Sequence, residues 1–284
     1  MTHCLTWIWS LRVIVVASSH FAHKRMIFSL FRQVLRALLL GGMLVSMVGT
    51  MTHCTHMEAT PDDADGLFKE AEEAFKDGRH LIAIERYRDL KNRFPYSNKS
   101  VEAELRIADA HFAMEGYIEA EGAYEVFKEL HPSHPKMDYV QYQIAMSHYN
   151  QIPENSARDL TSALYAMDAF EEVWEKFPNS TYVEKSKEYH QEARKRLAEH
   201  ENYVAAFYFD RRHYLSASYR YAALLQDYPN LGYEEEALFR LGHCYLNIRM
   251  FSNARDAFNR LINQFPKSSF RSESESLLNR MGKN

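Results

Sequence analysis

Residues 217–229 read ASYRYAALLQDYP and carry an alanine at 217, a tyrosine at 221 and a proline at 229. The same pattern, an alanine followed four residues later by Tyr or Phe and twelve residues later by proline, occurs five times along the chain. The five sets are Ala83/Tyr87/Pro95, Ala120/Tyr124/Pro132, Ala166/Phe170/Pro178, Ala217/Tyr221/Pro229 and Ala254/Phe258/Pro266. A fixed offset that recurs in order indicates a chain built from repeated structural units.

Each position of this pattern has a physical role in a pair of helices. The alanine and the ring lie four residues apart and therefore share one helical face. The small alanine lets the partner helix approach closely, and the ring fills the gap between one hairpin and the next. The proline lacks an N–H and forces the preceding residue out of the α region, so it ends the helix. The residues before the prolines are all rings: Phe94, His131, Phe177, Tyr228 and Phe265.

The first helix of each pair carries a second repeated pattern, in which a small residue is followed by a ring. It is seen in Ile107-Ala108 with His111-Phe112, in Val204-Ala205 with Tyr208-Phe209, and in Leu241-Gly242 with Cys244-Tyr245. Together these features resemble the tetratricopeptide repeat, a helix–turn–helix unit of about 34 residues. We therefore expect an all-α solenoid of five helix hairpins over residues 65–284.

The third and fourth units are longer than the others. The polar segment 150–159, NQIPENSARD, should lengthen the turn between the paired helices of the third unit. Residues 181–209 contain neither glycine nor proline. They predict one uninterrupted helix of about 40 Å, at ~1.5 Å per residue. This elongated first helix of the fourth repeat should extend beyond its partner and brace the two halves of the array.

Composition narrows the possible classes of protein. The chain has 284 residues, of which 46% are hydrophobic and 13% aromatic, enough for a buried core. Its net charge of −4 gives no support to nucleic-acid binding. We find no glycine-rich phosphate loop and no metal-ligand spacing, so we predict neither an enzyme nor a cofactor. Three cysteines far apart in sequence do not make a disulfide framework, and Cys244 should pack as a small apolar residue.

The N-terminal residues predict a secretory signal. From Met26, the basic residues Arg32 and Arg36 precede an apolar core at 37–48 and a run of small and polar residues that ends at Cys54. The core is too short to span about 30 Å of hydrocarbon as a helix. We expect a signal peptide at 26–53 and a misassigned N-terminal extension at 1–25. The alternative is a second hydrophobic segment at 5–17, which Arg12 interrupts.

A cysteine at the end of a signal region suggests a bacterial lipoprotein that is cleaved before Cys54 and acylated there. Residues 54–64 would then be a lipidated flexible linker. The three residues before the cut, Met51, Thr52 and His53, depart from the usual lipobox of Leu at −3 and Gly or Ala at −1. Two alternatives are an ordinary secreted protein with an incidental cysteine and a metal site at His53, Cys54 and His56, which lacks a fourth ligand.

Three passages go beyond the general repeat. Residues 131–142, HPSHPKMDYVQY, resemble the P-x-H-P-x-x-D-Y-x-x-Y segment of the BamD family, the lipoprotein subunit of the outer-membrane β-barrel assembly machine. Residues 177–182, FPNSTY, resemble that family's Y-P-x-S-x-Y, and residues 211–220, RRHYLSASYR, its R-G-x-Y/W-x-A-x-x-x-R. The resemblance spans about residues 65–270. Arg212 stands where the family usually has glycine.

The resemblance implies a non-enzymatic adaptor, anchored by lipid at the periplasmic face of the outer membrane. It would bind the POTRA domains of a BamA-type barrel protein, other Bam lipoproteins and unfolded outer-membrane proteins, but no nucleic acid. Residues 65–150 would form the substrate groove, and residues 151–284 would bind the partner. The alternatives are another periplasmic tetratricopeptide protein, either a coordinator of envelope division or a secretin pilotin.

We choose candidate binding residues in two ways: by matching positions in the family passages, and by the chemistry of their side chains. A groove of rings and polar groups suits an extended peptide, and the candidates for it are Arg106, His111, Phe112, Tyr117 and Tyr142. Arg106 could pair with a terminal carboxylate, or it could be solvated; the rings could instead belong to the core. The candidates for partner contact are Arg211, Tyr214 and Arg220. For Arg220 the alternative is a surface salt bridge to Asp227 or Glu236. His131 and His134, beside two prolines, should stiffen a loop and not bind metal.

Overall fold

A computed structural model describes residues 63–282, so the predicted extension at 1–25, the signal peptide at 26–53 and Cys54 lie outside the described residues. The described part contains eleven helices and no strand. The helices are α2 (Ala64–Lys76), α3 (His80–Arg93), α4 (Asn98–Ala113), α5 (Tyr117–Leu130), α6 (Met137–Asn150), α7 (Thr161–Lys176), α8 (Val183–Asp210), α9 (Tyr214–Asp227), α10 (Glu234–Asn247), α11 (Phe251–Gln264) and α12 (Arg271–Met281).

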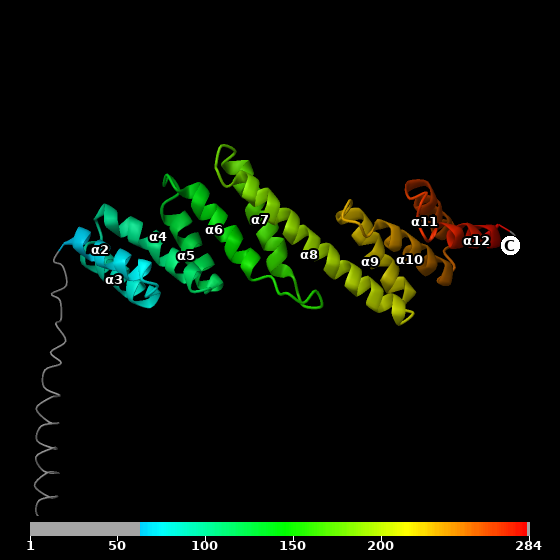
Figure 1. Ribbon diagram of the computed structural model, residues 1–284, viewed down its shortest axis with the longest axis horizontal. Coiled ribbons are helices and arrows are strands. Elements are labelled where there is room, and N and C mark those ends of the chain that lie inside the picture. Colours follow the sequence, from blue (N-terminus) through cyan, green and yellow to red (C-terminus); the bar gives the residue numbers. More distant parts are fainter. Residues whose placement is uncertain (1–62, 283–284) are drawn as a thin grey trace, which may run out of the picture. The chain divides into compact units, whose positions relative to one another are not determined.

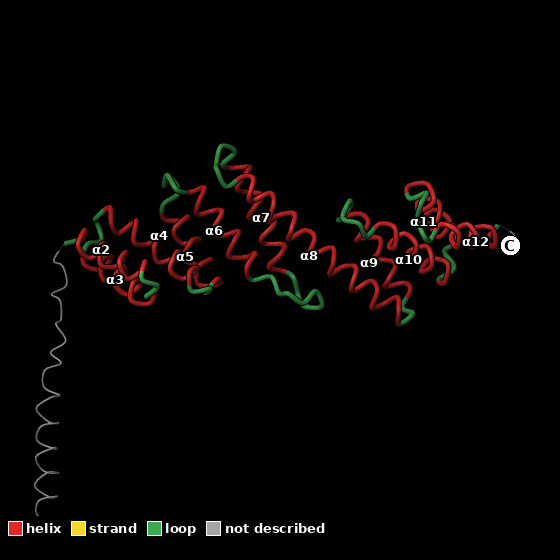
Figure 2. The backbone as a smooth tube through the Cα atoms, in the orientation of Figure 1, coloured by secondary structure: helices red, strands yellow, loops and turns green. Residues whose placement is uncertain are grey.

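The helices follow one another in a row, each packed on the next (Figure 1), and short loops join them (Figure 2). The pairs α2/α3, α4/α5, α6/α7, α8/α9 and α10/α11 are the five predicted hairpins, and the all-α repeat architecture is confirmed. First helices of neighbouring hairpins also touch, since α2 contacts α4, α6 contacts α8 and α8 contacts α10. The sequence did not predict α12 as a separate helix; it packs on α11 and follows the last hairpin.

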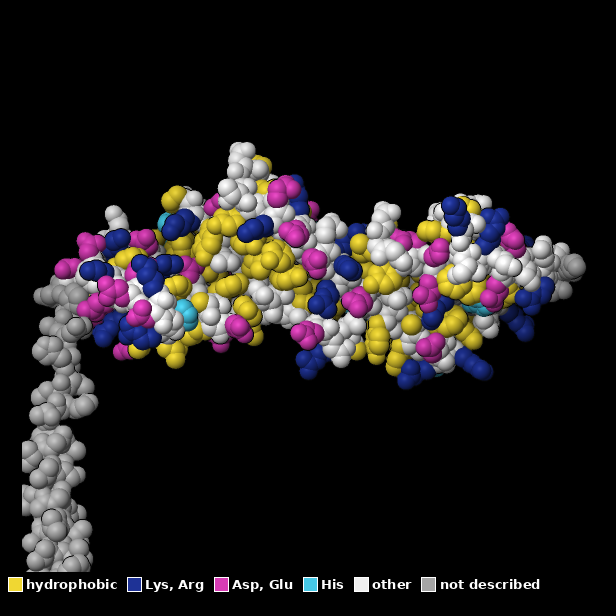
Figure 3. Space-filling model, viewed as in Figure 1, with side chains coloured by type: hydrophobic (Ala, Val, Ile, Leu, Met, Phe, Trp, Pro, Cys, Tyr) yellow, Lys and Arg dark blue, Asp and Glu magenta, His cyan; other side chains and the backbone are white. Residues whose placement is uncertain are grey.

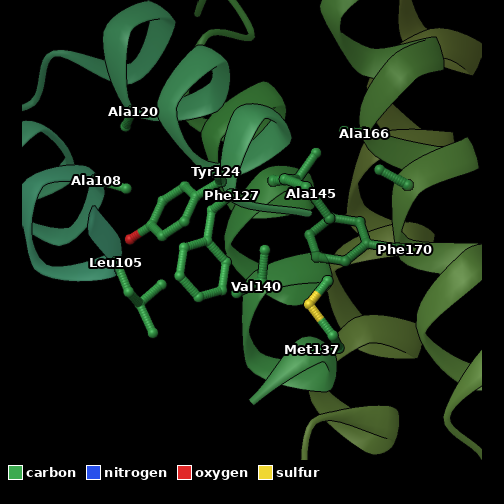
Figure 4. Packing of buried hydrophobic residues seen from close by; sticks show 12 residues of the cluster. Leu105, Ala108, Ala120, Tyr124, Phe127, Met137, Val140, Ala145, Ala166 and Phe170 are labelled. Atoms are coloured by element: carbon green, nitrogen blue, oxygen red, sulfur yellow. The ribbon is translucent and has the colours of Figure 1, made fainter. Parts of the chain in front are cut away.

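The repeated alanine and ring form the core, as predicted. All five alanines and all five rings of the pattern are fully buried. Figure 4 shows this packing around the second and third hairpins, where Tyr124 and Phe127 lie among Leu105, Ala108 and Val140. Full burial of one such ring contributes on the order of 1.5–3 kcal/mol.

The prolines end the second helices in one common geometry. Each of α3, α5, α7, α9 and α11 stops at the ring before proline, with φ between −129° and −124° and ψ between 52° and 66°. The N–H of that ring residue still donates to the carbonyl four residues back, for example Phe94 to Leu90. The chain therefore leaves every hairpin in the same direction.

Helix α8 has 28 residues and nearly coincides with the predicted 181–209. Tyr189, near its start, packs against the core of the second and third hairpins. Ala198 and Ala205 belong to the core of the last two hairpins. One continuous helix thus joins two hydrophobic clusters. The long loop before α7 docks on it, because the ring of His200 contacts the Ser156 carbonyl at 2.5 Å.

Four turns between paired helices contain a residue with positive φ at the same repeat position, five residues before the alanine. These residues are Gly78 (74°), Glu115 (60°), Arg212 (62°) and Arg249 (62°). Only glycine adopts this left-handed conformation without steric cost. Arg212, which departs from the glycine of the BamD pattern, therefore keeps the turn but carries local strain.

Two smaller features complete the core. A Cβ on Gly242 would lie 2.5 Å from Cε1 of Phe258, so glycine is required for this ring to pack on α10. Cys244 is fully buried, and burial raises the pKa of its thiol to about 12. It therefore stays protonated and packs as an apolar side chain, as predicted.

Arg212→Gly should raise the free energy of unfolding by about 1 kcal/mol, because an L residue in the left-handed region costs about 1–2 kcal/mol. Urea unfolding of the full chain measures the difference. Ser216→Gly, at an exposed position inside α9, is the control and should lower stability by about 0.5 kcal/mol. A loss of stability in Arg212→Gly would show that the turn is unstrained.

Candidate polypeptide-binding surfaces

Arg106 lies on α4 and is bound by the protein's own carboxylates. Its Nε and Nη2 donate to the two carboxylate oxygens of Glu72 on α2, both at 2.6 Å, and its Nη1 donates to Asp109 at 3.2 Å. The guanidinium also lies over the ring of Phe75, at 4.8 Å from the centroid. The guanidinium of Arg106 is therefore engaged by carboxylates of the chain itself, and it joins the first two hairpins.

Tyrosine hydroxyls extend this contact into a polar network. The hydroxyl of Tyr87 donates to Glu72 at 2.5 Å, and the hydroxyls of Tyr124 and Tyr139 both donate to Asp109 at 2.8 Å. Burial would raise the pKa of Glu72, but the hydrogen bonds from Arg106 and Tyr87 outweigh burial and lower it. We call these six residues the Glu72–Arg106–Asp109 network; it links the first three hairpins.

Phe112 and Tyr117 contact each other across the turn of the second hairpin. Their rings meet edge to face, with centroids 5.3 Å apart. The same contact closes two other turns, in the pairs Phe75–His80 at 5.0 Å and Phe209–Tyr214 at 5.9 Å. Three of the eight candidate residues in the repeats thus close hairpin turns. His111 is half-buried beside Phe112, and burial lowers the pKa of its imidazole.

Tyr142 belongs to a surface that sequence reasoning largely missed. Helix α6 carries Tyr139, Tyr142 and Tyr149, and α8 with its N-cap residue carries Tyr182 and Tyr189. Tyr142 stacks on Tyr182 at 4.8 Å, and Tyr149 meets Tyr189 at 4.9 Å. All five are half-buried, and we call them the tyrosine face. Figure 3 shows hydrophobic side chains gathered over this part of the chain, on the face that it draws.

The hydroxyls of the tyrosine face are largely unused. Of these five tyrosines, within residues 63–282, only Tyr139 uses its hydroxyl in hydrogen bonds: it donates to Asp109 and accepts from Gln143. Burial raises the pKa of Tyr142 to about 12 and also raises that of Tyr149 and Tyr182. These hydroxyls therefore stay protonated and can donate to a bound chain. The spacing of 139, 142 and 149 on one helix was the sequence signal for three of the five tyrosines of this face.

The three candidates for partner contact lie on the fourth hairpin. Arg211 ends α8, and its guanidinium lies 3.6 Å from the ring centroid of Phe207. Nη1 of Arg220 contacts both carboxylate oxygens of Glu201, at 3.0 and 3.1 Å. The alternative of a surface salt bridge is correct in kind, but the proposed acceptors, Asp227 and Glu236, are wrong. Glu236 instead pairs with Arg240 at 2.6 Å.

The histidines of the 131–142 passage are held by packing. Nε2 of His131 contacts Glu104 at 2.6 Å, and His134 meets the ring of Phe127 edge to face at 5.1 Å. The described residues hold no group of His, Cys, Asp and Glu arranged for a metal ion. None of the helices described is long and apolar enough to cross a membrane.

Arg106→Leu should lower the free energy of unfolding at pH 7 by about 1–3 kcal/mol, because the Glu72 carboxylate loses both donors of Arg106 and keeps only the hydroxyl of Tyr87. The pKa of Glu72 is lowered in the folded protein, so the contact stabilises above the usual carboxyl pKa of about 4.3 and is lost as pH falls through the lowered value. The difference between wild type and variant should therefore shrink below that pH. Urea unfolding across pH 3–7 measures it, and a difference independent of pH would contradict the assignment.

Comparisons with known proteins agree with the resemblance. The model of the family described as YfiO, outer membrane lipoprotein, matches residues 60–257. The outer membrane protein assembly factor BamD of Neisseria gonorrhoeae is 30% identical over 213 residues, which cover 72% of this chain and 80% of that protein. BamD of Xylella fastidiosa strain 9a5c is 26% identical, with 72% and 75% covered.

Among solved structures, the TPR2AB-domain:pHSP90 complex of yeast Sti1 matches with a TM-score of 0.39 and 14% identity. It covers 72% of this chain and 78% of that one. The family match extends over well more than half of the chain and includes all three passages that resemble BamD. The chain therefore belongs to the YfiO family of outer membrane lipoproteins, which the resemblance to BamD predicted.

Proposed function

We propose that this chain is a non-enzymatic adaptor of the outer-membrane β-barrel assembly complex. It binds the POTRA domains of a BamA-type barrel protein and unfolded outer-membrane proteins, alongside other Bam lipoproteins. Membership of the YfiO family, together with relatives named as outer membrane protein assembly factors, carries this proposal. The chain works at the periplasmic face of the outer membrane, held by a lipid on Cys54, the cysteine at the end of the predicted signal peptide.

The tyrosine face is the proposed contact for the unfolded substrate. Tyrosine rings offer large, rigid contact area with little loss of side-chain entropy, and their hydroxyls bond to a main chain. An extended segment with aromatic residues can lay its rings on Tyr142 and Tyr182 and bond its carbonyls to the free hydroxyls. This surface includes the predicted Tyr142 but crosses the predicted border at 150/151, because α8 and its N-cap residue supply two of the five tyrosines.

The other groove candidates take supporting roles in this proposal. Arg106 is engaged by Glu72 and Asp109, so it holds the first helices in place and leaves the substrate to the tyrosine face. Phe112 and Tyr117 fix the turn of the second hairpin, with His111 beside them.

Arg220 is the proposed contact for the partner. It is 46% exposed, and only its Nη1 is engaged by Glu201, so its remaining N–H groups face no acceptor among residues 63–282. A guanidinium with free donors can accept a second carboxylate in bidentate geometry. Arg211 and Tyr214, the other two proposed contacts, lie at the turn between α8 and α9 of the same hairpin.

Arg220→Ala should lower recovery of the BamA-type barrel protein at least fivefold when the tagged full chain is isolated from detergent-solubilised outer membranes. A lost charge-assisted contact at an interface costs about 2–5 kcal/mol, while the half-exposed pair with Glu201 contributes at most about 1 kcal/mol to folding. Arg88→Ala, an exposed arginine on α3, is the matched control and should recover the barrel protein fully. Failure of the wild-type chain to recover any such protein would defeat the proposed function.

Tyr142→Ala combined with Tyr182→Ala should reduce photo-crosslinking of an unfolded outer-membrane protein to the full chain at least fivefold, because the stacked pair is removed. Recovery of the barrel protein should be unchanged, since Arg220 is untouched. The control is Tyr96→Ala, which removes a fully exposed ring on a different part of the chain. Equal crosslinking in all variants would place substrate binding away from the tyrosine face.

A further inference from the structure

A pocket of about 340 Å³ lies where the turn between α10 and α11 meets the end of α12. Leu246 of α10, Phe251 of α11, and Leu277 and Met281 of α12 supply its apolar lining. None of the residues proposed for the substrate or the partner lines it. The pocket is therefore a surface separate from both.

Helix α12 takes the place of the first helix of a further hairpin, but it is shorter. In the preceding hairpins each second helix packs against the next first helix, as α3 does on α4 and α9 on α10. Helix α4 has 16 residues and α10 has 14, whereas α12 has 11 and ends at Met281. About one helical turn is therefore missing, at ~3.6 residues per turn. The pocket lies where α12 stops.

The residues beside this gap are less covered than their equivalents in other hairpins. Three hairpins carry a phenylalanine eight residues before the repeat alanine: Phe75, Phe112 and Phe209. In the same three hairpins the ring that closes the turn is half-buried: His80, Tyr117 and Tyr214. The last hairpin has the smaller Leu246 at the first of these positions and Phe251 at the second, and Phe251 is 48% exposed. The smaller side chain and the missing turn together leave the apolar lining open.

The charged groups of this pocket are all cationic. Arg255 and Arg280 line it, and no carboxylate does. Nη2 of Arg255 donates to the carbonyl of Met281 at 2.9 Å. Its other N–H groups, and the side chains of Arg280 and of Arg249 in the adjoining turn, have no hydrogen-bond or ion-pair partner among residues 63–282. Residues 249–282 carry six basic and three acidic side chains, although the whole chain has a net charge of −4. The pocket therefore favours an anionic occupant.

We propose that this pocket binds a short, acidic, amphipathic helix of a partner protein. Such a helix fills the place of the missing turn: its apolar side chains cover Leu246 and Phe251, and carboxylates one turn away on the same face pair with Arg255 and Arg280. A contact of this kind goes beyond the proposed contacts at the tyrosine face and Arg220.

An anionic membrane surface is a less suitable occupant. The proposed lipid anchor, Cys54, precedes α2, and α2 and α12 lie at opposite ends of the row of helices (Figure 1). The pocket is therefore at the end of the row away from the anchor. The repeats on either side of the pocket pack helix against helix, which also favours a helical polypeptide.

The probe is a rhodamine-labelled, blocked peptide of about 16 residues, because shorter isolated helices are marginal in water. Its alanine-rich sequence carries two leucines four residues apart, with glutamates one turn before and one turn after them on the same face. Binding to the full chain in mild detergent is followed by fluorescence anisotropy. Wild type should bind the peptide saturably. The same peptide with glutamine in place of glutamate, or with proline between the leucines, should bind at least tenfold more weakly.

Arg280→Glu should lower affinity for the glutamate peptide at least tenfold, because it reverses a charge that lines the pocket. Leu246→Phe should do the same by filling the pocket without a change of charge. It introduces the ring that three other hairpins have at this position, so the fold is kept, and thermal unfolding followed by circular dichroism checks this. Arg260→Glu, at an exposed position of α11 outside the pocket, is the matched control and should leave binding unchanged.

Absence of saturable binding, an equal loss in Arg260→Glu, or full binding by Leu246→Phe would overturn the proposal. It would also be overturned if soluble dihexanoyl-phosphatidylglycerol displaced the peptide at lower concentration than unlabelled peptide does, which would assign the pocket to a lipid headgroup. Self-association that Arg280→Glu abolishes, measured by light scattering without peptide, would assign it to a second copy of the chain instead. The adaptor role does not depend on these results, because it is tested through Arg220 and the tyrosine face.

Discussion

Burial of one aromatic ring against small residues, at the same position of every hairpin, is the contact on which the rest of the molecule depends. Tyr87, Tyr124, Phe170, Tyr221 and Phe258 are all fully buried, and each lies four residues after an equally buried alanine. Close approach of the paired helices requires the methyl group, and exclusion of water between hairpins requires the ring. At Gly242 even a methyl group is too large for Phe258. The direction in which the chain leaves each hairpin, set by proline, then places the next ring.

The hydroxyl of this ring decides which polar contact the ring makes with a first helix. Where the ring is tyrosine, its hydroxyl meets a charged residue of a first helix, as Tyr87 meets Glu72, Tyr124 meets Asp109 and Tyr221 meets Arg240. Where the ring is Phe170, no hydroxyl is available, and Tyr149 and Tyr189 cover it instead. The polar network and the tyrosine face are thus two solutions to the same packing problem. In the polar network, the tyrosine hydroxyls bond to charged side chains and stabilise the fold. In the tyrosine face, most hydroxyls have no partner among the described residues, and they are the groups we propose for substrate binding.

The fold followed from sequence because its determinants are local. An offset of four residues sets a helical face, and a proline ends a helix, without knowledge of anything distant. The contacts of the candidate residues could not be predicted in this way. Arg106 pairs with Glu72 34 positions earlier and Arg220 with Glu201 19 positions earlier. Such pairs depend on how one helix is rotated against the next. The tyrosine face was missed for the same reason, since two helices supply it, and α12 was missed because no alanine, ring and proline set follows it.

The length of α8 has a mechanical consequence. Tyr182 and Tyr189 lie at one end of an uninterrupted helix, and Glu201 and Phe207 lie near the other. No proline, glycine or left-handed residue interrupts the 28 residues, so the helix has no hinge at which the two ends could turn separately. The proposed substrate contact at Tyr182 and Tyr189 and the proposed partner contact at Arg220, which Glu201 holds, are therefore joined by one rigid helix, and a displacement at one end moves the other end with it.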